Sequence, residues 1–194
     1  GEDRGLSWYV MHFFAGESLR EQLARTPAPG IARYRTRLLG LVSELIRLRD
    51  RDHFWHGDIK PENIIVTGTG RRGLRLIDPA LHGQPYVDEG GYGETLVGTL
   101  TPAYNPAAYG AEQADSCALV LLLFELETGV QPLVDDGPTY LIGQDFSLYT
   151  RKVWEELALE RYDRYRTTPL LALLLDWIRT SPSLEDLYGL LVSA

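Results

Sequence analysis

The chain has 194 residues, a formal net charge of −8 and 44% hydrophobic residues, which fits one globular domain and excludes a disordered chain. The acidic balance argues against binding to nucleic acid or to an anionic membrane surface. The longest strictly apolar run, Cys117 to Phe124, is far shorter than the roughly 20 residues of a membrane span. The first residues do not resemble a secretory signal, and a single cysteine cannot form an internal disulfide. We therefore expect a soluble, cytoplasmic protein.

The N-terminal part of the chain predicts a strand and then a short helix. Residues Leu6 to Phe14 are rich in aromatic and β-branched types, which is typical of a strand. Ser18 and Glu21 match a capping box, in which each side chain accepts a hydrogen bond from a free backbone N–H. This pattern predicts a helix that begins after Ser18 and ends near Arg25.

A long amphipathic helix is predicted next. From Ile31 to Leu48 the apolar residues recur in alternating steps of three and four, which is the pattern of one helix face. We expect the opposite face to be solvated and to have no function. The residues on that face are Arg33, Arg35, Arg37, Glu44, Arg47 and Arg49.

Two short strands, residues 63–66 and 74–77, are predicted around a turn at residues 67–73. Residues 68–73 spell G-x-G-x-x-G, but they precede a strand and not a helix, so we interpret them as a hairpin turn and not as a dinucleotide site. Residues 79–110 show no sustained periodicity. A loop of that length inside a compact domain is usually functional.

The second half of the chain is predicted to be helical. Residues Cys117 to Phe124 are leucine-rich and apolar on all sides, so we expect a helix buried in the core. Further helices are predicted around Tyr149–Tyr165, Pro169–Arg179 and Leu184–Val192, the last with Ser183 as its N-cap. The expected fold is mainly α (α+β), a helical bundle around a buried central helix with a small β-hairpin.

One stretch carries a pattern of polar residues typical of a catalytic site. Asp58, Lys60 and Asn63 place a carboxylate, an amine and an amide at spacings of 0, +2 and +5, and Asp78 adds a carboxylate after the next strand pair. Phosphoryl transfer needs such groups, because its transition state spreads negative charge over oxygens while the nucleophile is held in line. Asp58 would accept a hydroxyl proton, and Lys60 would place a positive charge on the phosphate. Asn63 and Asp78 would supply the oxygen ligands that Mg²⁺ prefers.

These residues resemble the eukaryotic-like serine/threonine protein kinases. Residues 56–63, H-G-D-I-K-P-E-N, are similar to the H-R-D-L-K-P-x-N catalytic loop, and Asp78 stands where the D-F-G aspartate belongs. Residues 98–106 resemble the end of the activation segment, and residues 115–129 resemble the buried central helix of the family. Residues 9–19 resemble the hinge strand and the start of the next helix. The segments keep the order that they have in the family.

The resemblance implies a role for each matched residue. Catalysis would rest on Asp58 and Lys60, with ATP and Mg²⁺ as cofactors. His56 and Asp115 would support the catalytic loop, with Asp115 capping its backbone. The residues expected to contact the nucleotide are Met11, Phe13, Lys60, Asn63 and Asp78, of which Asn63 and Asp78 would also hold the metal.

The resemblance also implies a domain organisation. The whole chain, 1–194, would be a single kinase-like C-terminal lobe: a hinge strand and linker (1–17), the first helices with the catalytic loop and hairpin (18–77), an activation-segment-like loop (78–110), and the central and C-terminal helices (111–194). The expected partners are a protein substrate or a regulatory protein, and an N-terminal lobe supplied by the rest of a longer protein or by another chain. Neither nucleic acid nor membrane is expected.

Several positions depart from the family pattern. Gly57 replaces the arginine that reads activation-loop phosphorylation, and Asp78-Pro79-Ala80 replaces D-F-G. Ala107 stands near the position of the A-P-E glutamate. Because the glycine-rich loop and the V-A-I-K lysine do not precede the hinge, we expect the chain alone to bind ATP weakly. It should turn over far below the ~1–100 s⁻¹ of complete kinases.

Two other functions remain open. A pseudokinase, which keeps the fold and acts as a binding or regulatory module, is favoured by Gly57 and the Asp-Pro-Ala sequence but opposed by the intact polar residues. A small-molecule kinase of the aminoglycoside-phosphotransferase type commonly shares the H-G-D loop. Lys60-Pro61 and residues 98–106 favour protein kinases over this second alternative.

Overall fold

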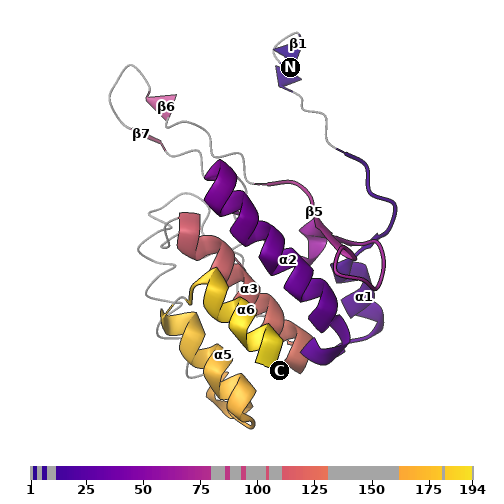
Figure 1. Cartoon of the computed structure of the whole chain (residues 1–194), viewed down its shortest axis with the longest axis vertical. Helices are drawn as coiled ribbons and strands as arrows, with labels where there is room; N and C mark the ends of the chain where they lie inside the picture. The colour runs from indigo at the N-terminus through magenta and orange to yellow at the C-terminus, as the bar shows by residue number, and fades with distance from the viewer. Residues whose placement is uncertain are drawn as a thin grey trace, which may run out of the picture.

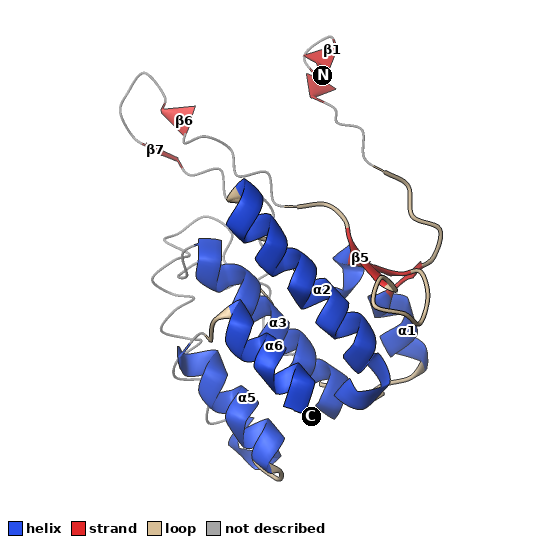
Figure 2. Ribbon diagram, in the orientation of Figure 1, coloured by secondary structure: helices blue, strands red, loops and turns tan. Residues whose placement is uncertain are grey.

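The computed structural model of the chain describes residues 2–3, 6–7, 12–79, 86–87, 93–94, 104, 111–130, 162–180 and 182–193. This part of the chain is mainly helical (Figures 1 and 2). The helices are α1 (Leu19–Arg25), α2 (Ile31–Asp52), α3 (Ala111–Thr128), α5 (Pro169–Thr180) and α6 (Leu184–Ser193), with 3₁₀ turns η1 (Pro61–Asn63) and η2 (Asp163–Tyr165). The α-rich fold class expected from the sequence is confirmed, while the division into a single domain stays a prediction.

A three-stranded antiparallel sheet lies beside α1 and α2, with strand order β3-β4-β5. Its strands are β3 (Glu17–Ser18), β4 (Ile64–Val66) and β5 (Leu74–Leu76). Ile65 pairs with Arg75 at the centre of the hairpin, and the Thr67 N–H donates to the Gly73 carbonyl at 2.9 Å to close the turn. The hairpin and its turn are thus confirmed. Two further two-stranded ribbons are β1 (Glu2–Asp3) with β2 (Leu6–Ser7), and β6 (Tyr86–Val87) with β7 (Gly93–Glu94).

The strand predicted over Leu6–Phe14 is wrong in its second half. Leu6–Ser7 forms β2, but residues 12–15 have no regular structure, and residues 8–11 lie outside the described residues. The outer edge of β4 pairs instead with Glu17–Ser18, which the composition did not mark as a strand. Strand formation depends on a partner edge as much as on propensity, and the edge of β4 is already occupied.

Helix α1 begins as its capping box predicts. The Glu21 N–H donates to the Ser18 hydroxyl at 3.2 Å, and the Ser18 N–H donates to the Glu21 carboxylate at 2.7 Å. Each of these bonds satisfies a backbone donor that the helix itself leaves free. The cap fixes the junction between β3 and α1, and therefore the direction in which α1 leaves the sheet.

Helix α2 buries the predicted apolar face, but its opposite face is only partly solvated. Arg37 is 9% exposed, and its guanidinium lies 4.1 Å from the centre of the Tyr34 ring; burial lowers the pKa of Arg37. Arg35 donates to the Leu191 carbonyl at 2.7 Å, and Arg49 pairs with Glu185. The prediction of a free solvated face is therefore wrong, because the hairpin turn at Gly68 contacts Arg37 and α6 packs along α2 (Figure 1).

Helix α3 forms the centre of the core. Each side chain from Cys117 to Phe124 is at most 1% exposed, as the uniformly apolar pattern predicts. The helix contacts α2, α5 and α6 (Figure 2), and the Phe124 ring meets the Tyr162 and Tyr165 rings edge-on with centroids 5.3 and 5.6 Å away. Burial of this helix fixes Asp115, near its N-terminus, against the backbone of residues 56 and 57.

The C-terminal helices agree with prediction where they are described. α5 and α6 occupy the expected ranges, and Ser183 caps α6 by accepting a hydrogen bond from the Asp186 N–H at 3.1 Å. Most of the helix predicted around Tyr149–Tyr165, and most of the loop predicted at 79–110, lie outside the described residues. Across the part of the chain that is described, no helix has the length and apolar character required to cross a bilayer.

Candidate active site

The loop before η1 is held by a buried carboxylate of the central helix. Asp115, in the first half of α3, is 1% exposed and accepts two hydrogen bonds: from the His56 N–H at 2.8 Å and from the Gly57 N–H at 2.7 Å. The predicted contact between Asp115 and the loop backbone is present. Buried backbone donors must be paired, so this one side chain stabilises the conformation of the loop.

The backbone conformation explains why residue 57 is a glycine. Its φ angle is +74°, in the left-handed region that residues with a β-carbon rarely adopt. The turn at this point lets the N–H groups of His56 and Gly57 both donate hydrogen bonds to the Asp115 carboxylate. The glycine that departs from the family pattern is therefore favoured by the backbone geometry of this loop.

His56 connects the loop to the end of the hairpin. Its Nε2 lies 3.0 Å from the Ile77 carbonyl, and its Nδ1 accepts from the Asp58 N–H at 3.4 Å. Burial lowers the pKa of His56 to about 4, against the opposing effects of the Ile77 carbonyl and the Asp58 and Asp78 carboxylates. The ring is thus neutral at neutral pH, and a neutral ring that donates from Nε2 and accepts at Nδ1 satisfies both contacts. This arrangement fits the predicted supporting role and not that of a base.

Three of the predicted side chains meet within the loop. The Lys60 Nζ lies 2.7 Å from the Asp58 Oδ2, and the Asn63 Nδ2 donates to the same oxygen at 2.9 Å. Asn63 also donates to the Asp58 main-chain carbonyl at 3.0 Å. The 3₁₀ turn η1, opened by Pro61, brings Asn63 back over Asp58 and produces this convergence.

One oxygen of Asp58 has no partner. Its Oδ1 is fully buried and is the one buried side-chain nitrogen or oxygen in the described part of the chain that makes no hydrogen bond. Leaving a buried acceptor unpaired costs about 1–3 kcal/mol, so an oxygen of this kind indicates a functional constraint.

Asp78 joins this group from the end of β5. The Ile77 N–H donates to the Asn63 carbonyl at 3.0 Å, and the Asn63 Nδ2 lies 3.5 Å from the Asp78 carbonyl. Asp78 has a φ of +50°, a strained conformation for a residue with a side chain, although aspartate tolerates it better than most. Strained backbone often occurs at functional sites, where neighbouring contacts maintain it.

The donor set at this site fits Mg²⁺ better than a structural metal. Among the described residues no group of three or more His, Cys, Asp or Glu side chains could hold a metal ion. Mg²⁺ typically takes only one or two protein ligands and completes its shell with substrate phosphates and water. The amide oxygen of Asn63 accepts no hydrogen bond from the described residues, because the group turns its nitrogen to Asp58. That oxygen, together with the carboxylate of Asp78, whose main chain adjoins Asn63, is the donor set that would hold such an ion.

No protein-family model matches the chain, and no curated protein sequence matches it.

Of the two nucleotide contacts predicted on the hinge, Phe13 lies in the described part of the chain. Met11 lies outside the described residues, and Phe13 is 85% exposed, so the structure does not bring the Phe13 ring against the catalytic loop. An adenine contact from these two residues stays a prediction. The polar loop is the part of the predicted site whose members the structure brings together.

A buried ionic cluster beside the loop was missed from the sequence. Arg20 of α1 donates to the Glu62 carboxylate at 2.7 Å and to the Tyr104 hydroxyl at 2.8 Å, and it also pairs with Glu125 of α3. The Tyr104 hydroxyl in turn donates to Glu125. Burial and the Glu125 carboxylate both raise the pKa of Tyr104. Since Glu62 directly precedes Asn63, the cluster connects the central helix to the expected metal-binding end of the loop.

A signal for this cluster was present in the sequence. Glu125 interrupts the apolar run from Cys117 to Leu126, and it is only 3% exposed. A charge in such a position requires a buried partner. Its partners could not be named, because Arg20 and Glu125 are 105 positions apart.

Proposed function

We propose that this chain is the substrate-binding and Mg²⁺-binding lobe of a serine/threonine protein kinase, which transfers the γ-phosphoryl group of ATP to a protein hydroxyl. The observation that carries the proposal is the arrangement at Asp58, where one carboxylate oxygen is buried and unpaired while the other is 2.7 Å from the Lys60 ammonium. A polar surface turn would leave neither oxygen buried.

Each side chain has a definite task in this reaction. The substrate hydroxyl oxygen forms a bond to the γ-phosphorus, the bond from that phosphorus to the bridging oxygen breaks, and ADP leaves. The hydroxyl proton passes to Asp58 Oδ1, which lies within a rigid loop and has no competing donor. Lys60 stabilises negative charge on the transferring group. Mg²⁺, held by Asn63 and Asp78, would neutralise charge on the phosphate oxygens.

The supporting residues act by positioning. Asp115 holds the backbone before Asp58, and the neutral His56 ring spans from the loop to the residue before Asp78. Together they hold the base and the expected metal ligands at a fixed separation. Fixed geometry of this kind supplies much of the catalysis in phosphoryl transfer, where the protein does little covalent chemistry.

The test is γ-phosphoryl transfer from labelled ATP to protein hydroxyls by the longest natural protein that contains this chain. Asp58→Asn keeps the size of the side chain and removes the proton acceptor, so kcat should fall by about 10²- to 10⁴-fold. The matched control is Asp50→Asn, at a carboxylate that is 60% exposed, and its kcat should be unchanged.

Other outcomes would assign other functions. An unchanged rate for Asp58→Asn would contradict the proposal. A wild-type protein that binds partners but transfers no phosphate would favour the pseudokinase. Transfer to small alcohols but not to proteins would favour the aminoglycoside-type kinase, which shares the H-G-D loop.

A further inference from the structure

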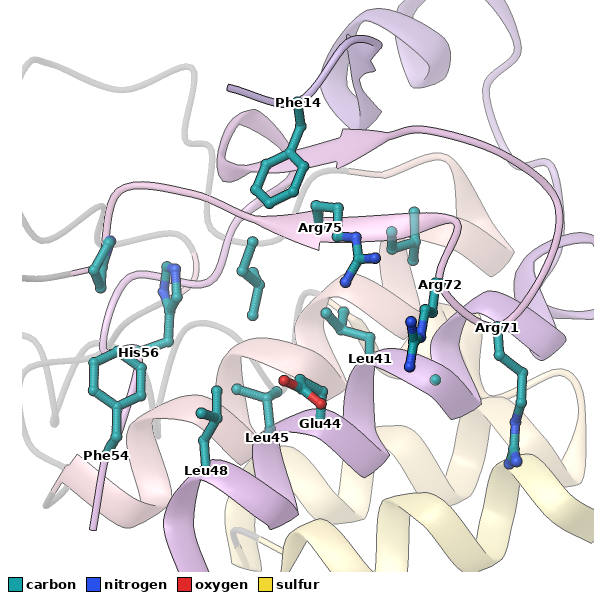
Figure 3. A pocket seen from close by; sticks show the side chains of 14 residues that line it. Phe14, Leu41, Glu44, Leu45, Leu48, Phe54, His56, Arg71, Arg72 and Arg75 are labelled. Atoms are coloured by element: carbon teal, nitrogen blue, oxygen red, sulfur yellow. The ribbon is translucent and has the colours of Figure 1, made fainter. Parts of the chain in front are cut away.

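A groove lies between α2 and the hairpin, beside the loop that carries Asp58. It encloses about 280 Å³, and its apolar floor comes from Leu41, Leu45 and Leu48 of α2 and from Leu74 and Leu76 of β5. Figure 3 shows Leu41, Leu45 and Leu48 in a row along the helix, with Phe54 and His56 at one end of the groove. The proposed phosphotransfer does not use this groove.

The length of the groove suits a short extended peptide. Its lining on α2 runs from Gly40 to Leu48, and eight helical steps correspond to about 12 Å. An extended chain covers that distance with about four residues. The lining on the other side is the whole of β5, so the groove follows the strand direction.

Among the described residues, one edge of β5 carries no neighbouring strand and could accept such a segment. In the described sheet β5 has β4 on one side and no strand on the other. Main-chain hydrogen bonds join Ile77 to Asn63 and Thr67 to Gly73, and hydrogen-bonded pairs alternate along an antiparallel ladder. The N–H and C=O groups of Leu74 and Leu76 therefore point away from β4. An exposed edge of this kind can add a strand from another chain.

The rim of the groove is positively charged, although the chain as a whole carries −8. Arg71, Arg72 and Arg75 all line it, and Figure 3 shows Arg72 and Arg75 extending from the hairpin toward α2. The one acidic residue of the lining, Glu44, is already paired with Arg47 at 3.0 Å. Glu44 also attracts Arg75 electrostatically, but three arginines against one glutamate leave the lining with a net positive charge.

The three arginines differ in how far they are already engaged. Arg71 donates to the Tyr188 hydroxyl at 3.1 Å, and the Arg75 guanidinium lies 5.5 Å from the centre of the Phe14 ring. The exposed Arg72 side chain makes no hydrogen bond or ion pair within the described residues. The Arg71 guanidinium is thus directed toward α6 (Figure 3). An aromatic ring does not neutralise a guanidinium, so the charges of Arg72 and Arg75 are the ones available to an anionic ligand.

We propose that this groove binds an extended segment of a partner protein in which a large apolar side chain is flanked by several carboxylates. The apolar side chain would enter the leucine floor, the carboxylates would pair with the arginines, and the segment would extend the sheet at β5. A polyphosphate has no apolar group to enter the leucine floor. A fatty acid brings a single carboxylate to a groove where both Arg72 and Arg75 are available. The proposal does not depend on catalysis at Asp58.

Fluorescence anisotropy with two labelled hexapeptides, EELFEE and KKLFKK, tests this proposal on the whole chain. The acidic peptide should bind at least about 10-fold more tightly than the basic one, a difference of about 1.4 kcal/mol. The double variant Arg72→Glu with Arg75→Glu should weaken binding of the acidic peptide by at least about 10-fold and should bind the basic peptide better than the wild type does. Arg164→Glu, at an exposed arginine of η2 outside the groove lining, is the control for a charge reversal elsewhere on the chain and should leave both affinities unchanged.

Reversal of the preference distinguishes the groove from general charge attraction, because Arg164→Glu removes the same kind of charge elsewhere. A lack of saturable binding of the acidic peptide up to about 1 mM would overturn the proposal. Equal affinity for both peptides, or equal losses in the double variant and in the control, would do the same. Displacement of the acidic peptide by laurate at equal concentration would show a lipid site instead, and would also overturn it.

Discussion

Replacing Asp115 with alanine should strongly destabilise the fold, because it leaves two buried backbone donors without partners. The carboxylate of Asp115 is 1% exposed and accepts from the His56 N–H at 2.8 Å and the Gly57 N–H at 2.7 Å. Each buried donor left unpaired costs about 1–3 kcal/mol. We therefore expect Asp115→Ala to lower the free energy of unfolding by about 2–6 kcal/mol.

Urea unfolding followed by far-UV circular dichroism measures this loss, because the midpoint and slope give the free energy of unfolding. Thermal unfolding gives a second readout, and a domain of this size loses about 2–4 °C in Tm per kcal/mol. Asp115→Asn should be intermediate, since the amide oxygen can still accept one of the two hydrogen bonds. Asp50→Ala, at an exposed carboxylate, should change stability by less than about 0.5 kcal/mol. If Asp115→Ala and Asp50→Ala were equally stable, the anchoring role of Asp115 would be refuted.

Two further predictions concern the groups around the loop. The folded state holds the pKa of His56 at about 4, below its ordinary value of 6.5. Between these pH values the unfolded chain binds more protons than the folded chain. The free energy of unfolding therefore falls as the pH drops from about 6.5 to 4. His56→Gln should remove about 3 kcal/mol of that pH dependence, and parallel wild-type and variant curves of unfolding free energy against pH would contradict this. Arg20→Met should lower the free energy of unfolding in urea by about 3–5 kcal/mol, because it leaves Glu125 buried without its cation. Arg25→Met, at an exposed arginine, is the control and should leave the urea midpoint unchanged. Equal midpoints for the two arginine variants would be evidence against the buried cluster.

The elements that the sequence predicted well are those fixed by local pattern. The uniformly apolar run at Cys117–Phe124 has only one favourable place, the core, and the structure puts it there. The capping box at Ser18 and the glycine-rich turn before Leu74 also depend on residues within a few positions of one another. Hydrogen bonds of this kind join residues that are close in the sequence, so the sequence alone identifies both partners.

The features that the sequence predicted poorly depend on distant partners. The helical period marks only the more apolar side of α2, so it assigned Arg35, Arg37 and Arg49 to a solvated face. Arg37 is instead buried against the hairpin turn at Gly68, and Arg35 and Arg49 bind α6, which comes more than a hundred residues later. The strand expected through Phe14 failed because β4 already pairs with Glu17–Ser18. Spacing alone likewise brought Asp58, Lys60 and Asn63 together as candidates, but it could not show that one oxygen of Asp58 is buried and unpaired.

The most direct test of the phosphotransfer account is to locate the nucleotide-bound metal on the chain by NMR. Mn²⁺ in place of Mg²⁺, added with ATP, broadens the amide signals of residues near the metal, and this readout works even for weak binding. The account predicts broadening centred on Asn63 and Asp78, and a clear reduction of that broadening in Asn63→Leu, which removes one oxygen ligand. Broadening centred elsewhere, or broadening at these positions that Asn63→Leu leaves unchanged, would contradict it.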